Sequence, residues 1–346
     1  MPNRSTVHQL TRIVEYISRG YHLCYSVIAV FFDIEKAYDT VWHKGLLAKL
    51  INLKIPSDFI SIISSFVSLR IFKFIVRTPF SSVKHIWQVF LKVLSYLQHF
   101  IIYCTSDIPR HDFSQLAMYA DDTVIYCRKW NMLSTHRVIP QRLHSIDKWT
   151  KLWKIKINST KTSAIVFTKS RAALPSFLFL RNVQIHYVLK TKYLGILLHW
   201  RLNWKEHILK NKYAALTRLK QIMLLLLSTV LSLRCNLSLY KLYIRSQMIY
   251  AASAWGFTPN TTSHHLQMVH NKAFRIIGGY DFFTKQIQMH DDLEIPTVSE
   301  YIRVITKNFY IQTRENENVL ISNIGKYNVA MYNKHKTAKH ILLNLW

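Results

Sequence analysis

Tyr119-Ala120-Asp121-Asp122 decides the fold of this chain, because two adjacent carboxylates stand in the middle of a hydrophobic alternation. Leu116-Ala117-Met118 precedes the motif and Thr123-Val124-Ile125-Tyr126 follows it. This pattern predicts a strand, a tight acidic turn and a second strand. Two negative charges at a hairpin tip repel each other, and a divalent cation is the usual reason for holding them there.

The composition of the chain limits the class of partner. Its 346 residues, half of them apolar, suffice for two or three domains or one multi-lobed enzyme with a sizeable core. The 46 Lys and Arg against 18 Asp and Glu give a net charge of +28, which indicates a polyanionic partner. Tyr and Trp interleaved with these basic residues favour nucleic acid over an anionic membrane, because aromatic rings stack on bases.

Cysteine spacing and hydropathy argue against several other classes. The four cysteines form no CxxC or Cys/His pattern, so we expect no structural zinc and an intracellular location, in the nucleus or cytoplasm. The longest apolar run, Ile222 to Leu233, is too short to span a bilayer, so we expect no membrane partner. Met1 to Ser5 lacks the apolar region of a signal peptide, which argues against secretion.

A third carboxylate is expected beside the acidic pair. The apolar run Val27 to Phe32 predicts a buried strand that ends at Asp33. If this strand neighbours the hairpin, Asp33, Asp121 and Asp122 converge and need cations. Two Mg²⁺ ions about 3.5–4 Å apart would suit phosphoryl transfer. Structural roles stay open, since Asp33 could be a helix N-cap and the acidic pair a simple turn.

The remaining periodicity predicts alternating helices and strands in the first 200 residues and a basic, helical region from about residue 205. Helices are expected over 6–20, 39–53, 58–70 and 138–153, and strands over 26–33, 71–76 and 193–198. Residues 154–168 are expected to form a strand, a turn at Asn158-Ser159 and a second strand.

Two motifs resemble the catalytic motifs of reverse transcriptases from non-LTR (LINE-type) retrotransposons, jockey-like elements of arthropods in particular. Phe31 to His43, FFDIEKAYDTVWH, resembles the first, and Ala117 to Thr123, AMYADDT, resembles the second. Weaker similarities follow along the chain. Ser5–Leu10 resembles the end of the fingers, and Trp149–Phe167 resembles the next palm motif. Tyr193–Ile208 resembles the primer-grip region, and Asn271–Ile277 resembles the region after the thumb. The resemblance covers nearly the whole chain.

The resemblance implies specific roles for the acidic residues and one lysine. Asp33, Asp121 and Asp122 would be catalytic and would bind two Mg²⁺ ions, with Mn²⁺ as an alternative. Lys161 would protonate or steady the leaving pyrophosphate; its alternative is an ordinary solvated lysine.

It also implies contacts with the substrates, which would be an RNA template, a DNA primer and deoxynucleoside triphosphates. Ile34 would offer its backbone to the triphosphate, and Tyr38 would exclude a 2′-hydroxyl or else be a core aromatic. Tyr119 would bind substrate, and Tyr193-Leu194-Gly195 would lie near the primer end as the primer grip.

The implied fold is α+β, a right-hand polymerase whose palm is an antiparallel sheet backed by helices. Residues 1–26 would be a remnant of the fingers, 27–200 the palm with a partial fingers insertion, and 201–346 a helical thumb and C-terminal region. The upstream fingers strands of the family are missing, so the chain is expected to be truncated.

One stretch departs from the family pattern and is expected to be degenerate. Where LINE-type enzymes carry Ala-Gly-Val-Pro-Gln-Gly, this chain has Trp87 to Lys92, and residues 71–100 as a whole look altered. Codons for the family motif, read one nucleotide late, permit the Gln-Val-Phe-Leu-Lys found at 88–92, so we hypothesise a local frameshift. His199 also replaces the usual Asp after the Tyr-Leu-Gly segment.

The sequence therefore predicts an RNA-directed DNA polymerase domain of a non-LTR retrotransposon. The family reaction is two-metal nucleotidyl transfer, and the sequence leaves open whether this chain still catalyses it. Two alternatives remain: a catalytically silent RNA-binding remnant of such an element, and a group II intron maturase-like protein. Trp42-His43 and Trp204 to Ile208 favour the retrotransposon over the maturase.

Overall fold

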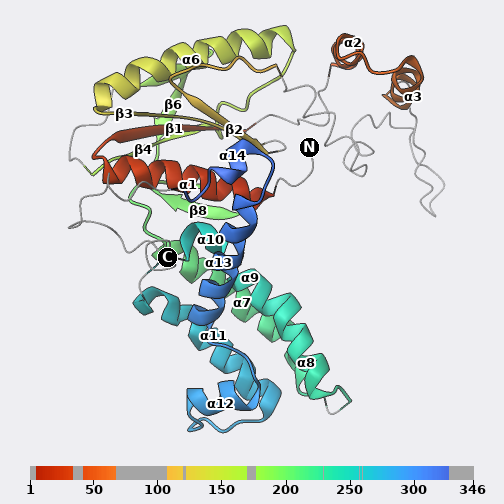
Figure 1. The fold of residues 1–346 in the computed structure, drawn as a ribbon, viewed down its shortest axis with the longest axis vertical. Helices are drawn as coiled ribbons and strands as arrows, with labels where there is room; N and C mark the ends of the chain where they lie inside the picture. The colour runs from red at the N-terminus through yellow and green to blue at the C-terminus, as the bar shows by residue number, and fades with distance from the viewer. Residues whose placement is uncertain are drawn as a thin grey trace, which may run out of the picture. The chain divides into compact units, whose positions relative to one another are not determined.

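The computed structural model describes residues 5–33, 42–67, 107–119, 122–169, 177–228, 230–256, 258 and 260–326. The chain divides into two compact units, which we describe separately. The sheet unit comprises Ser26–Val166 and Arg171–Val188. The helical unit comprises Met1–Tyr25, Phe167–Ser170 and Leu189–Trp346. Figure 1 gives the element labels used below.

A six-stranded, mostly antiparallel sheet organises the sheet unit, in the order β2-β3-β1-β4-β6-β5. The β4–β6 pair is parallel. The strands are β1 (Ser26–Asp33), β2 (Gln115–Tyr119), β3 (Asp122–Lys129), β4 (Ser163–Phe167), β5 (Leu178–Leu180) and β6 (Val183–Tyr187). Every residue of β1 before Asp33 is buried. An uninterrupted apolar run is what an interior strand of a sheet requires, because both of its faces are covered.

Three helices belong to the described part of the sheet unit: α2 (His43–Asn52), α3 (Ser57–Val67) and α6 (Met132–Leu152). Helix α6 extends along the sheet in Figure 1. Its apolar residues Ile139, Leu143 and Ile146 recur at helical spacing and join the core formed by the strands. The helix begins after Asn131, whose side chain accepts a 2.7 Å hydrogen bond from the Ser134 amide.

The helical unit begins with α1 (Thr6–His22). The Ser5 side chain accepts from the His8 amide, and the His8 ring accepts in return from the Ser5 amide. A two-stranded hairpin, β7 (Lys190–Tyr193) and β8 (Ile196–His199), precedes the remaining helices. These are α7 (Lys205–Leu226), α8 (Leu233–Leu239), the π-helix η1 (Tyr240–Arg245), α9 (Ser246–Met248), α10 (Ala252–Trp255), α11 (Asn260–Gly278), α12 (Gln286–Asp292), α13 (Val298–Arg314) and α14 (Val319–Ser322).

Buried polar side chains connect the helices of this unit. Gln267 of α11 bonds the His290 ring at 2.9 Å and accepts from the Val298 amide at 2.9 Å. His290 stacks on His270, and the Tyr240 hydroxyl shares a hydrogen bond with the His270 ring. Burial lowers the pKa of His270 to about 3, with His290 and Arg245 adding to the effect. The ring is therefore neutral at physiological pH.

The mixed α+β architecture and the strand over 26–33 are confirmed. Two element predictions need correction. Residues 193–198 are a hairpin rather than one strand, because Leu194 and Gly195 have positive φ values and reverse the chain. The stretch before Asn158 is irregular, with a single bridging residue at 157, so only the strand after the turn forms. Among the described helices, none combines the length and apolarity needed to cross a bilayer.

Candidate active site

Three of the residues singled out by sequence form a row across three adjacent strands of the sheet unit. Asp122 of β3 directly faces Asp33 of β1 in the antiparallel register. On its other side, Asp122 faces Tyr119 of β2. Side chains of directly opposed residues lie on the same face of a sheet, with Cα atoms about 4.5–5.5 Å apart. Two carboxylates and a phenol ring therefore neighbour one another at the end of these strands.

The strands end here because the hydrophobic pattern ends here. Residues of β3 after Asp122 are buried as far as Cys127, and residues of β1 before Asp33 are buried. Asp33 itself keeps 36% of its side chain exposed. Two carboxylates on directly opposed residues repel each other. This end of the sheet is therefore suited to attracting a cation.

A lysine supplies positive charge to this carboxylate row. Lys161 Nζ lies 3.3 Å from Asp33 Oδ2, although the lysine side chain is 68% exposed. The loop that carries the lysine is tied to the same strand end, since the Asn158 amide donates a 2.8 Å hydrogen bond to the Asp33 carbonyl. The main chain thus places the lysine and the carboxylate together independently of their attraction.

The Asn158 side chain gives that loop its shape. Its Oδ1 accepts hydrogen bonds from the Thr160 amide at 3.1 Å and the Lys161 amide at 3.3 Å, as well as from the Thr160 hydroxyl at 2.7 Å. The Asn158 carbonyl accepts from the Thr162 amide at 3.1 Å and starts the return into β4. An Asn side chain that bonds its own downstream backbone is a common turn device, and the sequence prediction of a turn at this residue is confirmed.

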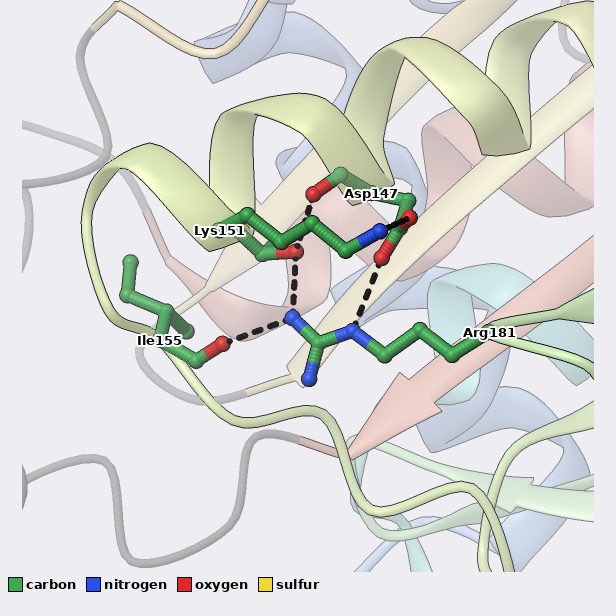
Figure 2. A network of polar contacts seen from close by, with 5 residues as sticks. Asp147, Lys151, Ile155 and Arg181 are labelled. Atoms are coloured by element: carbon green, nitrogen blue, oxygen red, sulfur yellow. Dashed lines mark hydrogen bonds and ion pairs between the residues drawn. The ribbon is translucent and has the colours of Figure 1, made fainter.

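A polar network fixes the chain just before that loop (Figure 2). Arg181, in the β5–β6 turn, donates to Asp147 at 2.8 Å, to the Thr150 hydroxyl at 2.8 Å and to the Ile155 carbonyl at 3.1 Å. Lys151 also pairs with Asp147, at 2.7 Å. Burial raises the pKa of Asp147, but the hydrogen bonds from Lys151 and Arg181 outweigh it, and the net pKa is lowered. The end of α6 and the following loop are therefore held in one position.

Sequence reasoning missed this network. Arg181 and Asp147 are 34 residues apart, and neither belongs to a motif. The one local signal is the Arg181-Asn182 pair, because both residues have positive φ values and Asn favours such turns. The partners of the arginine were not predictable from that signal.

Other predicted site residues lie outside the described residues. These are Asp121, Ile34, Tyr38 and the altered stretch Trp87 to Lys92. Among the residues that the structure does describe, no group of three or more His, Cys, Asp or Glu side chains could hold a metal. Asp33 and Asp122 supply two carboxylates to the row, and the predicted third ligand is not among the described residues.

The three residues predicted as a primer grip belong to the helical unit and form the end of the β7–β8 hairpin. Tyr193 pairs with Ile196, so Leu194 and Gly195 make the turn. The Tyr193 side chain is buried, whereas Gly195 is exposed. Any ligand that approaches this turn meets Leu194 and the Gly195 backbone rather than the tyrosine ring.

Comparison with known proteins identifies relatives of this chain. Residues 2–198 match the family model described as "Reverse transcriptase (RNA-dependent DNA polymerase)". The chain is 28% identical over 330 residues to the probable RNA-directed DNA polymerase from transposon X-element of Drosophila melanogaster, which covers 93% of this chain and 36% of that protein. It is 25% identical over 331 residues to the RNA-directed DNA polymerase from mobile element jockey of the same species, covering 92% and 36%. The chain thus spans about a third of the length of these relatives.

Proposed function

Because the chain belongs to the reverse transcriptase family, we propose that it is the polymerase core of a non-LTR retrotransposon protein and extends a DNA primer along an RNA template. One observation carries the chemical part of this proposal. Asp33 and Asp122 come from motifs 89 residues apart in the sequence, yet they are directly opposed on adjacent strands. A purely structural hairpin has no need to face a second acid.

The residues of the row fit a divalent metal. Carboxylate oxygens are the hard ligands that Mg²⁺ prefers, and one or two of them with substrate phosphates are a usual Mg²⁺ coordination. Asp33 and Asp122 would bind the metal together with Asp121, with two Mg²⁺ ions, or Mn²⁺, as the expected complement. Bound there, the metal would lower the pKa of a primer 3′-hydroxyl and offset charge on the leaving pyrophosphate.

The chain's own residues would bind and orient the other reactants. Lys161 lies on the ordered Asn158 loop beside Asp33, a suitable place to donate a proton or a positive charge to the leaving pyrophosphate. Tyr119, opposite Asp122, would line the same site and contact the incoming nucleotide. Ile34 would offer its backbone to the triphosphate, and Tyr38 would discriminate against a 2′-hydroxyl.

The subdivision into palm, fingers and thumb is also part of this proposal. The strands β1 to β3 with α6 would form the palm, because they carry the carboxylate row. Residues 1–26 would derive from the fingers, and the helices from α7 onward would form the thumb and C-terminal region. The helical unit contributes eight Lys and Arg between Lys205 and Arg245 against one acid, Glu206, which suits a nucleic-acid backbone.

Primer extension tests the function. The purified 346-residue chain is given an RNA template, an annealed DNA primer, the four deoxynucleoside triphosphates and Mg²⁺. We expect metal-dependent extension that Asp33→Asn abolishes and that Asp281→Asn, a change of an exposed acid in the helical unit, leaves intact. Absence of product from the unmodified chain with both Mg²⁺ and Mn²⁺ would contradict catalysis by this chain.

A second candidate function is a catalytically silent RNA-binding remnant. The altered Trp87 to Lys92 stretch favours it, because it replaces the glycines that the family places near the templating base pair. In that case the chain would bind RNA with a steep salt dependence, and Asp33→Asn would leave binding unchanged. Binding without extension distinguishes this outcome from the first.

A further inference from the structure

The turn between β7 and β8 has a backbone conformation that is costly for one of its residues. Leu194 has φ 43° and Gly195 has φ 86°. Two consecutive residues with positive φ are typical of the tight hairpin turns that match strand twist, but those turns favour Asn and Gly. A leucine in this conformation persists only where surrounding contacts hold it. The helical unit must therefore contain a residue that secures this turn.

Tyr250 is that residue. Its hydroxyl lies 3.1 Å from the Leu194 carbonyl oxygen and 3.1 Å from Thr6 Oγ1. A carbonyl only accepts, so the tyrosine donates its single proton to Leu194, and the Thr6 hydroxyl donates to the tyrosine oxygen. The hydroxyl thus connects the turn to the first residue of α1.

The tyrosine ring also restricts the other residue of the turn. A Cβ added to Gly195 would lie 3.0 Å from Tyr250 Cε1, which is closer than side chains normally approach. Glycine at this position therefore satisfies two requirements, the positive φ and the contact with the ring. The ring and the hydroxyl together hold both central residues of the turn.

Tyr250 is itself held by a buried framework. The Trp255 indole donates a 2.8 Å hydrogen bond to the Tyr250 carbonyl, and Trp255 is fully buried. Trp255 packs edge-on against His207, with ring centroids 5.6 Å apart. His207 Nδ1 in turn accepts a 3.4 Å hydrogen bond from the Leu197 amide of β8. The hairpin is thus attached to one helical framework both at its turn and along its second strand.

We propose that Tyr250 is a positioning residue for the primer end, which it serves by fixing the orientation of the Leu194-Gly195 turn. This inference rests on the proposed function and on the sequence prediction that Tyr193-Leu194-Gly195 is the primer grip. Since Tyr193 is buried, the turn offers the primer an exposed glycine backbone, and its effectiveness depends on where that backbone is held. Tyr250 acts through the turn and does not itself contact the reacting atoms.

The test compares Tyr250→Phe with Tyr213→Phe, which removes the hydroxyl of an exposed tyrosine on α7. Primer extension is measured at varied primer–template concentration, and hydrogen exchange is measured for the peptide covering residues 190–199. We expect Tyr250→Phe to raise the KM for primer–template roughly 2- to 10-fold, the value of one hydrogen bond, with little change in kcat. Exchange in the turn should accelerate by a similar factor. Tyr213→Phe should change neither quantity.

A second variant separates positioning from simple loss of a contact. Thr6→Val removes the other hydrogen bond to the Tyr250 hydroxyl, so its effect on exchange in the turn should be smaller when Tyr250→Phe is already present. Unchanged exchange in Tyr250→Phe would overturn the proposed attachment whatever the enzyme activity. Faster exchange with an unchanged KM would overturn the role at the primer end. No extension by the unmodified chain would instead reject the proposed function, and this inference with it.

Discussion

The sheet unit and the helical unit use polar side chains in opposite ways. In the sheet unit, Asp33 at the end of β1 and Lys161 on the Asn158 loop are partly exposed and pair with each other. In the helical unit, His207 and His270 are buried and have strongly lowered pKa values, so they remain neutral. Exposed charged pairs contribute little to folding, whereas buried polar groups support the fold only while they stay neutral and hydrogen-bonded. Substitutions in the two units should therefore affect different properties.

The largest expected effect is on catalysis and comes from the carboxylate row. Asp122→Asn keeps the shape of the side chain but removes a negative charge from the proposed metal site. We expect primer extension to fall by at least about 100-fold, because metal-based stabilisation of the transition state is worth several kcal/mol. The free energy of unfolding should change by at most about 1 kcal/mol, since repulsion with Asp33 is relieved.

Denaturant unfolding of the same preparation supplies the second measurement, with Asp291→Asn as a control at an exposed acid of α12. A loss of extension accompanied by a loss of several kcal/mol in the free energy of unfolding would contradict this contrast between the two units. The carboxylate row would then have a structural role, and the lost extension would reflect unfolding.

The next effect is on stability and its pH dependence in the helical unit. Burial lowers the pKa of His207 to about 4, and Lys210 adds to the effect. An unfolded histidine has a pKa of about 6.5, so the unfolded chain binds the proton first. The contribution of the neutral ring is complete above pH 6.5 and is lost as the pH falls toward 4. The loss approaches about 3 kcal/mol, at about 1.4 kcal/mol per pH unit.

Between pH 6.5 and 4, the free energy of unfolding of His207→Gln should depend less steeply on pH. The difference in slope should correspond to about one proton, whatever the effect of the substitution at neutral pH. The measurement is a series of denaturant titrations at half-unit pH intervals. His264→Gln, at an exposed position of α11, is the matched control and should leave the slope unchanged. Equal slopes for all three proteins would show that His207 does not titrate with unfolding.

The amino-acid sequence predicted the carboxylate row better than it predicted the network that surrounds it. The uninterrupted apolar run before Asp33 and the alternation around Asp122 each define a strand from local sequence. Because the chain has few acidic residues, two strands that each end at one are candidates to be neighbours. Arg181 and Tyr250 carry no such signal. Their partners are 34 and 56 residues away and are selected by tertiary packing. The turn at Leu194 was mistaken for a strand because leucine rarely adopts a positive φ.

Arg181→Met should have an intermediate effect on stability, because it breaks a polar network of the sheet unit whose role is structural. The change removes three hydrogen bonds and leaves Asp147, whose side chain is only 13% exposed, with Lys151 as its remaining ion-pair partner. We expect a cost of about 1–3 kcal/mol in the free energy of unfolding, measured in denaturant. Lys148→Met, at an exposed position on the same helix, should cost less than about 0.5 kcal/mol. Similar values for the two variants would show that the network does not hold the end of α6.

Lys161 separates catalysis from stability most clearly, because its substitution should slow the reaction strongly and hardly change the free energy of unfolding. Its pairing with Asp33 is exposed, so Lys161→Met should change the free energy of unfolding by no more than about 0.5 kcal/mol. If the lysine acts on the leaving pyrophosphate, single-turnover incorporation should nevertheless slow by about 100-fold, a usual contribution of a general acid. Lys156→Met, at an exposed lysine of the same loop, should affect neither quantity. An unchanged rate in Lys161→Met would assign this lysine to the solvated surface, and the carboxylates alone would then remain as candidate catalytic groups among the described residues of the row.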